Sequence, residues 1–196
     1  MKKREILYLS IILIGLILIV GYFALTPRKE STNLTNNLLI EFKQSGSCDE
    51  ISDFWKGTGY CFAETLDGEK GVIVLHPLST NSPGFIYTTL KIPTTANYLL
   101  IKLANLAGKF PLDSFYQHKM KCLNCDSEVR VVVMDLQPFT PTEGRFIITN
   151  AENWVYKNLT ISHLKGKEVL LVIYSIAGGK ENWNGEWLGI GKVEFK

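Results

Sequence analysis

One segment of the chain gathers the side chains best suited to binding a small polar ligand. Gly178 to Trp187 reads GGKENWNGEW and places amides, carboxylates and tryptophan between two strongly apolar runs. Sugar sites need flat aromatic faces for C–H surfaces and polar groups for hydroxyls, and loops often carry binding sites. The alternative is a solvated hairpin, with Trp187 in the core. The predicted ligand-binding residues here are Asn182, Trp183, Asn184 and Glu186.

A second candidate lies near the start of the predicted domain. Trp55 and Tyr60 fall between Cys48 and Cys61, so a disulfide there would close an aromatic loop. Such a loop predicts either a binding tip that presents Trp55 and Tyr60 or a packed cover over the core.

Catalytic signatures are missing from the sequence. None of the three histidines, His76, His118 and His163, stands at metal-ligand spacing from another, and no nucleophile-elbow, P-loop or dinucleotide-binding motif occurs. His163 is expected to be a surface turn residue. Asp126 and Glu128 are two carboxylates near one another, too few for a calcium site by themselves. The sequence therefore predicts no cofactor, with calcium as the remaining candidate, and a non-catalytic protein.

The four cysteines leave several arrangements open. Pairing Cys48 with Cys61 and Cys122 with Cys125 is the simplest disulfide scheme, and closing the first loop would contribute about 3 kcal/mol in the chain-entropy model. One zinc held by four thiolates and free thiols are the alternatives. Only Cys122 and Cys125 have the short spacing of a zinc ribbon, so disulfides are the prediction.

Two N-x-S/T sequons predict glycan attachment sites in an extracytoplasmic chain. Asn33 belongs to a polar stretch, and Asn158 falls in or beside a predicted strand.

Strand signals dominate the rest of the chain. Short runs rich in β-branched and aromatic residues are separated by turn signals such as Asp67-Gly68, Pro138 to Gly144 and Lys165-Gly166, without helical periodicity between them. This pattern predicts an all-β sandwich of about eight to nine strands; residues 105–120 are left open as a short helix or a long loop. The expected strands are 38–42, 71–75, 85–92, 98–104, 129–135, 146–149, 154–161, 168–176 and 185–195.

The C-terminal third resembles the end of galactose-binding-like jelly rolls of the carbohydrate-binding-module type. Trp154 to Tyr174 reads WVYKNLTISHLKGKEVLLVIY, followed by Gly178-Gly179 and by Glu186 to Ile190 (EWLGI). Ile92 to Lys102 is similar to an earlier strand pair of those domains. The resemblance implies a jelly-roll-like β-sandwich. Many such domains bind carbohydrate and others are structural, so it implies fold more than function.

The N-terminus predicts a membrane anchor. Ile6 to Leu25 contains 20 residues without a charge, which as a helix would span about 30 Å, the thickness of a bilayer core. Lys2, Lys3 and Arg4 precede it and favour a cytoplasmic N-terminus. A cleaved signal peptide is the alternative. The predicted organisation is residues 1–5 in the cytoplasm, a signal anchor at 6–25, a polar stalk at 26–37 and an extracytoplasmic domain at 38–196.

Charge argues against one class of partner. Removing residues 1–25 leaves 18 of the 21 basic and 18 of the 19 acidic side chains, whereas nucleic-acid binders usually carry a basic face. The sequence therefore predicts a membrane-anchored binding module for glycans or cell-envelope components, with the lipid bilayer as one partner. The alternatives are a structural or assembly protein that contacts an envelope protein, and an envelope enzyme with thiol-disulfide or hydrolytic chemistry.

Overall fold

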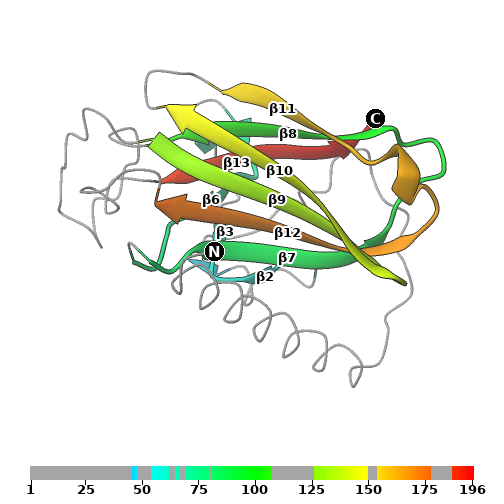
Figure 1. Ribbon diagram of the computed structural model, residues 1–196. Coiled ribbons are helices and arrows are strands. Elements are labelled where there is room, and N and C mark those ends of the chain that lie inside the picture. The colour runs from blue at the N-terminus through cyan, green and yellow to red at the C-terminus, as the bar shows by residue number, and fades with distance from the viewer. Residues whose placement is uncertain are drawn as a thin grey trace, which may run out of the picture. The chain divides into compact units, whose positions relative to one another are not determined.

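The chain divides into two compact units, Met1–Thr32 and Asn33–Lys196, and every described residue belongs to the second. The computed structural model describes residues 46–47, 54–61, 65–66, 69–79, 81–106, 126–149, 154–177 and 187–196 (Figure 1). Among these residues no helix is long and apolar enough to cross a membrane. The predicted anchor 6–25, stalk 26–37 and strand 38–42 lie outside them.

Two antiparallel sheets pack face to face and form a β-sandwich (Figure 1). One sheet has six strands in the order β1-β3-β6-β13-β8-β11 and the other has five in the order β10-β9-β12-β7-β2. A small third sheet joins β4 to β5. The six-stranded sheet contains β1 (Gly46–Ser47), β3 (Tyr60–Cys61), β6 (Ile73–Leu75), β13 (Leu188–Phe195), β8 (Tyr98–Asn105) and β11 (Val155–Thr160). The five-stranded sheet contains β10 (Phe139–Thr149), β9 (Asp126–Leu136), β12 (Glu168–Ala177), β7 (Gly84–Lys91) and β2 (Lys56–Gly57), and the third sheet β4 (Thr65–Leu66) and β5 (Glu69–Lys70).

The strands of three or more residues, β6 to β13, follow jelly-roll connectivity. Numbered one to eight along the chain, they form sheets in the order 1-8-3-6 and 5-4-7-2, so successive strands mostly cross between the two layers. The prediction of an all-β sandwich of eight to nine strands is thus confirmed for the described residues.

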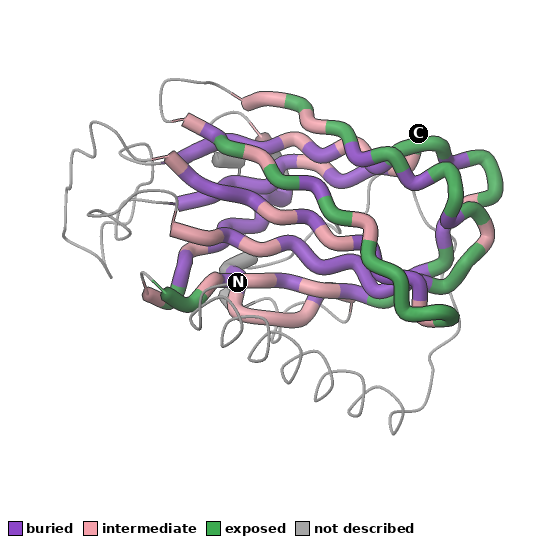
Figure 2. Tube along the Cα trace, viewed as in Figure 1, coloured by how far each residue is buried: buried purple, intermediate pink, exposed green. Residues whose placement is uncertain are grey.

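The core lies between the two sheets and follows from the alternation within each strand. In β7, Ile86 and Leu90 are buried in the core, whereas Phe85 and Tyr87, on the opposite face of the strand, are half-buried. The alternation of buried and less buried residues can be followed along the strands in Figure 2. Successive side chains of a strand point to opposite faces, so alternate residues of the two sheets meet in the middle. Trp55, Ile101, Val131, Leu171 and Ile190 are among the side chains that fill the core.

One turn expectation is wrong. Pro138 to Gly144 was expected to form a turn, but the chain turns at Gln137 and Pro138 and β10 begins at Phe139. A strand can contain Pro141 here because β10 is the edge strand of its sheet, and edge strands are where sheets accept a residue without an N–H. Gly144 points inward, where a Cβ atom would come within 2.9 Å of the Phe146 ring.

A second, smaller apolar cluster covers the outer surface of the six-stranded sheet. Val72, Val74, Ala104, Leu106 and Trp187 form it, and Trp154 packs against it. Trp187 is 8% exposed, which confirms that this residue belongs to packed structure.

Candidate functional site

The predicted binding residues divide between those the structure describes and those it does not. Asn182, Trp183, Asn184 and Glu186 lie outside the described residues, and their ligand contacts stay a prediction. Trp55 has no exposed surface, because its indole packs in the core and meets the Phe54 ring edge-on at 5.6 Å. The structure therefore favours the packed-cover alternative for Trp55 over a binding tip.

The other predicted positions near that loop remain open. The backbone of Tyr60 and Cys61 forms β3, whereas Cys48, Cys122 and Cys125 lie outside the described residues. The disulfide scheme thus remains a prediction. Asn158 is exposed on β11, an edge strand, and Asn33 lies outside the described residues.

The structure places the remaining candidates at separate points. His163 is exposed in the short helical turn Ser162–Leu164, as expected, and its Nε2 atom lies 2.8 Å from Thr142 Oγ1. The Glu128 carboxylate accepts hydrogen bonds from Arg130 and Arg145, and these two positive charges disfavour the binding of a cation there. Within the described ranges no group of three or more His, Cys, Asp or Glu side chains is close enough together to hold a metal ion.

The densest combination of aromatic and charged side chains lies on the outer face of the five-stranded sheet. Pairing aligns Phe85, Tyr174, Arg130 and Arg145 in one row across four strands. The next row runs from Tyr87 through Val172 and Val132 to Glu143. We call this surface the aromatic–ionic face and define it by Phe85, Tyr87, Tyr174, Glu128, Arg130, Glu143 and Arg145.

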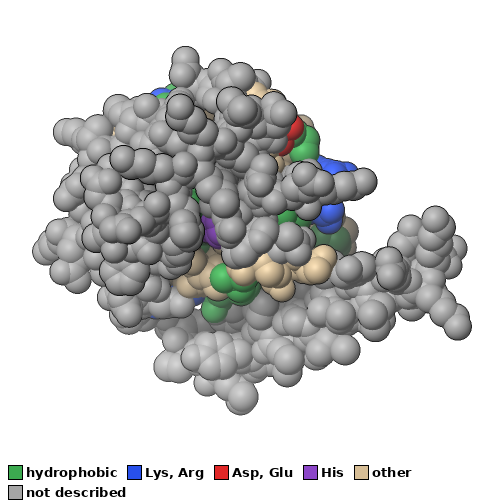
Figure 3. Space-filling model, turned by 90° about the vertical axis from the view of Figure 1, so that its left-hand side faces the viewer, with side chains coloured by type: hydrophobic (Ala, Val, Ile, Leu, Met, Phe, Trp, Pro, Cys, Tyr) green, Lys and Arg blue, Asp and Glu red, His purple; other side chains and the backbone are tan. Residues whose placement is uncertain are grey.

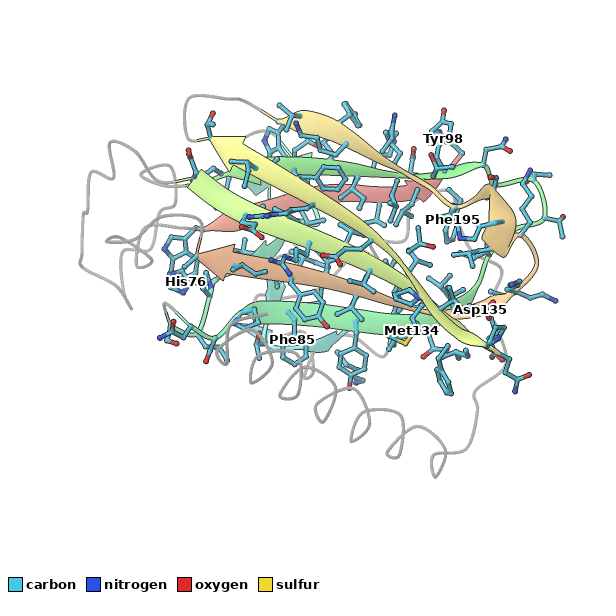
Figure 4. The ribbon with its side chains drawn as sticks, in the orientation of Figure 1. His76, Phe85, Tyr98, Met134, Asp135 and Phe195 are labelled. Atoms are coloured by element: carbon cyan, nitrogen blue, oxygen red, sulfur yellow. The ribbon has the colours of Figure 1, made fainter. Side chains whose placement is uncertain are left out.

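The aromatic half of the face is formed by β7 and β12. The Phe85 and Tyr87 rings are two residues apart on one strand, with centroids 6.3 Å apart and planes 24° from parallel. The Tyr174 ring lies 6.1 Å from Phe85 on the neighbouring strand and is tilted by 45°. Phe85 projects from β7 in front of the sheet in Figure 4. All three rings are half-buried and so retain accessible surface.

The ionic half of the face is formed by β9 and β10. Glu128 accepts a hydrogen bond from Arg130 Nε at 2.9 Å and another from Arg145 Nη2 at 2.7 Å. Glu143 stands 3.7 Å from Arg130 Nε and its side chain is 48% exposed. Two carboxylates therefore balance two guanidinium groups, and most N–H groups of both arginines remain available for other acceptors.

The surroundings set the charge states of this face. Burial by itself would raise the pKa of Glu128, but the hydrogen bonds and charges of Arg145 and Arg130 outweigh burial and lower that pKa below its ordinary 4.5. Burial, with a smaller contribution from Glu143, raises the pKa of the Tyr174 phenol. At neutral pH Glu128 is therefore ionised and the Tyr174 phenol is neutral.

This combination is suited to holding a flat polyhydroxylated molecule. Half-buried rings offer apolar faces, and adjacent guanidinium and carboxylate groups offer donors and acceptors to hydroxyls. Figure 3 shows the molecule from the left-hand side of Figure 1; among its coloured atoms, basic, acidic and hydrophobic side chains lie close together. Sequence reasoning missed this face because its residues belong to four strands whose pairing cannot be read from the chain. The available signal was the outward pair Phe85 and Tyr87 within the predicted strand 85–92.

Comparisons with known proteins found likeness in structure alone. No protein-family model matches the chain, and no curated protein matches it in sequence. Among solved structures, TmCBM61 in complex with β-1,4-galactotriose matches at a TM-score of 0.48 and 7% identity, over 72% of this chain and 87% of that one. A family 29 carbohydrate-binding module with mannohexaose matches at a TM-score of 0.44 and 14% identity, over 84% and 93%.

A larger enzyme is also similar over part of its length. Arthrobacter globiformis T6 isomalto-dextranase complexed with panose matches at a TM-score of 0.47 and 15% identity, over 72% of this chain. The chain corresponds to only 21% of the length of that enzyme. The expected resemblance to carbohydrate-binding-module-type β-sandwiches is confirmed, as a resemblance of fold that by itself assigns no ligand.

Proposed function

We propose that the chain is a non-catalytic module that binds neutral glycans on the aromatic–ionic face. One observation carries the proposal: the rings of Phe85, Tyr87 and Tyr174 share a surface with the network of Glu128, Arg130, Glu143 and Arg145. A pyranose presents C–H groups on its faces and hydroxyls at its rim. The aromatic rings can pack against the C–H groups, and the paired charges can form hydrogen bonds with the hydroxyls.

The balance of charge on this face supports a neutral ligand. Glu128 and Glu143 compensate Arg130 and Arg145, so the face has no excess charge to attract a polyanion. The hydrogen-bonding heads are nevertheless open, because the side chain of Arg145 is 62% exposed and that of Glu143 is 48% exposed. Where a carboxylate lies next to a guanidinium, the carboxylate can accept a hydrogen bond from one hydroxyl of a diol while the guanidinium donates one to the neighbouring hydroxyl.

The proposal includes the extracytoplasmic compartment, which rests on the sequence. The 20 uncharged residues of 6–25 follow three basic residues, and this order favours an anchor with the sandwich on the outer side. A membrane-impermeant protease added to intact cells should then digest the sandwich. Protection of residues 38–196 in intact cells, with digestion after lysis, would contradict this placement.

Glycan binding is tested with the full chain in detergent micelles on native gels that contain xylan, galactan, galactomannan or dextran. Retardation by at least one polysaccharide is expected. Removing one ring by Tyr174→Ala should weaken it about tenfold, because a lost stacking contact costs on the order of 1 kcal/mol.

Phe139→Ala is the matched control for that variant. Phe139 is a 61% exposed ring on the outer face of the same sheet, but it pairs with Leu136, three rows away from the row of Tyr174. Its removal should leave retardation unchanged. Equal retardation of wild type, Tyr174→Ala and Phe139→Ala would exclude the aromatic–ionic face as the binding surface.

A further inference from the structure

The outer surface of the opposite, six-stranded sheet also carries a platform of aromatic rings. Trp154 immediately precedes β11, and Tyr156 is the second residue of that strand, with its side chain on the outer side. Tyr156 is 54% exposed, and Trp154 is half-buried. We call the group of Trp154, Tyr156, Lys102 and Glu69 the tryptophan face.

Two glycines of β13 allow the indole of Trp154 to lie directly against the sheet. A Cβ atom at Gly189 would lie 2.9 Å from Trp154 Cη2, and one at Gly191 would lie 2.9 Å from Trp154 Cζ3. Only residues without a Cβ therefore allow the six-membered ring of Trp154 to lie this close to the strand. The register of β13 also shifts between Ile190 and Lys192, next to the indole. The ring thus lies directly on the backbone of β13 and packs against the apolar cluster of Val72, Val74, Ala104, Leu106 and Trp187.

A single ammonium group connects the two rings. Lys102 Nζ lies 5.9 Å from the centroid of the Trp154 ring and 5.4 Å from that of Tyr156, within the range of cation–π attraction. The same ammonium donates to the Glu69 carboxylate of β5. This hydrogen bond raises the pKa of Lys102, so the ammonium keeps its charge at physiological pH.

The composition of this surface decides which occupant it suits. Among the described residues, the large hydrophobic side chains that are exposed on the outer face of this sheet are Tyr98 and Tyr156, whereas the exposed aliphatic side chains, Leu78 and Ile147, lie outside it. A surface that lies on a bilayer would be expected to add several exposed aliphatic or basic side chains to such rings. Aromatic rings beside an ion pair, with the exposed amide of Asn158 two residues further along, match a sugar.

We propose that the tryptophan face is a second sugar-binding surface, on the opposite side of the sandwich from the aromatic–ionic face. One pyranose stacks on Tyr156 and the accessible part of Trp154, and its hydroxyls bond to Lys102, Glu69 and Asn158. The site needs no residue of the five-stranded sheet. A chain with a site on each outer face can hold two polysaccharide strands at once, and this bivalence raises avidity without new contacts at either site.

The experiment removes the first face and asks what remains. The background is the full chain with Phe85→Ala and Tyr174→Ala, in detergent micelles, on native gels with xylan, galactan, galactomannan or dextran. Residual retardation by at least one of them is expected. Adding Tyr156→Ala should reduce it about tenfold, whereas Tyr156→Phe, which keeps the ring, and Phe139→Ala should not. No residual retardation, or equal retardation with and without Tyr156→Ala, overturns the proposal.

The same gels distinguish failure of sugar binding on the tryptophan face from failure of glycan binding on the aromatic–ionic face. If wild type and the background migrate alike while Tyr156→Ala releases the chain, the tryptophan face binds sugar and the aromatic–ionic face does not. If the Phe85→Ala, Tyr174→Ala background does not unfold cooperatively, and so is not properly folded, Tyr156→Ala is tested in the wild-type chain instead. That variant should reduce the number of sugar sites per chain from two to one, and an unchanged number overturns the proposal. Finally, bromine-labelled phosphatidylcholine that quenches tryptophan fluorescence of the reconstituted chain, but not of Trp154→Phe, would place this face on a bilayer and overturn it.

Discussion

Arg130 of β9 and Arg145 of β10 are directly paired on neighbouring antiparallel strands, although both carry a positive charge. Like charges in such a pair destabilise a sheet. Here both guanidinium groups donate to one carboxylate, that of Glu128, whose side chain is 9% exposed. The position of the arginines on the aromatic–ionic face therefore depends on a third residue.

Replacing Glu128 by Gln should destabilise the fold by about 2 kcal/mol. The substitution removes two charge-assisted hydrogen bonds and leaves the Arg130–Arg145 repulsion uncompensated, and the partial exposure of both arginines limits the cost. The measurement is the free energy of unfolding from denaturant titration. Glu143→Gln is the control, because the exposed Glu143 makes only a 3.7 Å contact and its loss should cost less than about 0.5 kcal/mol. Equal costs for the two variants would contradict the central role of Glu128.

Stability should fall at acid pH through three carboxylates. Hydrogen bonds from Lys167 and from the Gln137 backbone lower the pKa of Asp135, and Asp135 lies at the end of the sandwich opposite His76 (Figure 4). Burial opposes the shift for Glu194, but Lys192 and Lys196 outweigh it and lower its pKa, as the arginines do for Glu128.

The lowered pKa values of these three carboxylates determine how stability changes with pH. A group whose pKa is lower in the folded state stabilises the fold above its unfolded-state value, here 3.8 for Asp135 and 4.5 for Glu128 and Glu194, and this stabilisation is lost as the pH falls through the folded value. The melting temperature should be nearly constant from pH 7 to about pH 5 and drop below about pH 4.5. Glu194→Gln should start from a lower melting temperature and show a shallower drop. A wild-type melting temperature that rises on acidification would contradict the assignment.

Much of the fold could be predicted because buried strand positions are occupied mainly by apolar residues. Residues 168–176 are almost wholly apolar and β12 (Glu168–Ala177) is central in its sheet, with neighbours on both sides. The edge strand β10 was missed over 139–145, since Pro141 and Gly144 are turn residues by type. They are compatible with a strand only because of the edge position and the crowded inward face, and neither can be known before the strands are paired.

The candidate site could not be predicted in the same way. Phe85 and Tyr174 are 89 residues apart in the chain, and only the pairing of β7 with β12 places their rings 6.1 Å apart. Residue type by itself favoured tryptophan as the ligand contact, yet Trp55 is buried in the core. Aromatic residues supply large apolar area to cores as readily as to sites, and the sequence does not separate these uses.

Adding one methyl group at Gly191 should displace Trp154 from its seat on β13. The Cβ of Gly191→Ala would lie 2.9 Å from Trp154 Cζ3, so the indole must move or the strand must shift, at a cost of about 1–2 kcal/mol. The free energy of unfolding measures this cost. In a double-mutant cycle with Trp154→Ala, the Gly191→Ala penalty should largely disappear, because the clashing ring is gone. Additive penalties would show that Gly191 is needed for a reason other than the indole.

Gly84, which begins β7 next to Phe85, should be the least replaceable of the glycines compared here. A Cβ atom there would lie 2.0 Å from the carbonyl oxygen of His76, a backbone atom that cannot move aside without separating β6 from β7. Gly84→Ala should therefore cost about 3 kcal/mol and weaken polysaccharide retardation by shifting the Phe85 ring. Gly166→Ala is the matched control: its φ is +73°, but the nearest atom, Thr94 Cγ2, is 3.5 Å away, so only backbone strain of about 1 kcal/mol is expected, with binding intact. Denaturant unfolding and native affinity gels of both variants give the comparison, and a Gly84→Ala chain as stable as the Gly166→Ala chain would show that β6 and β7 do not pack as closely as described.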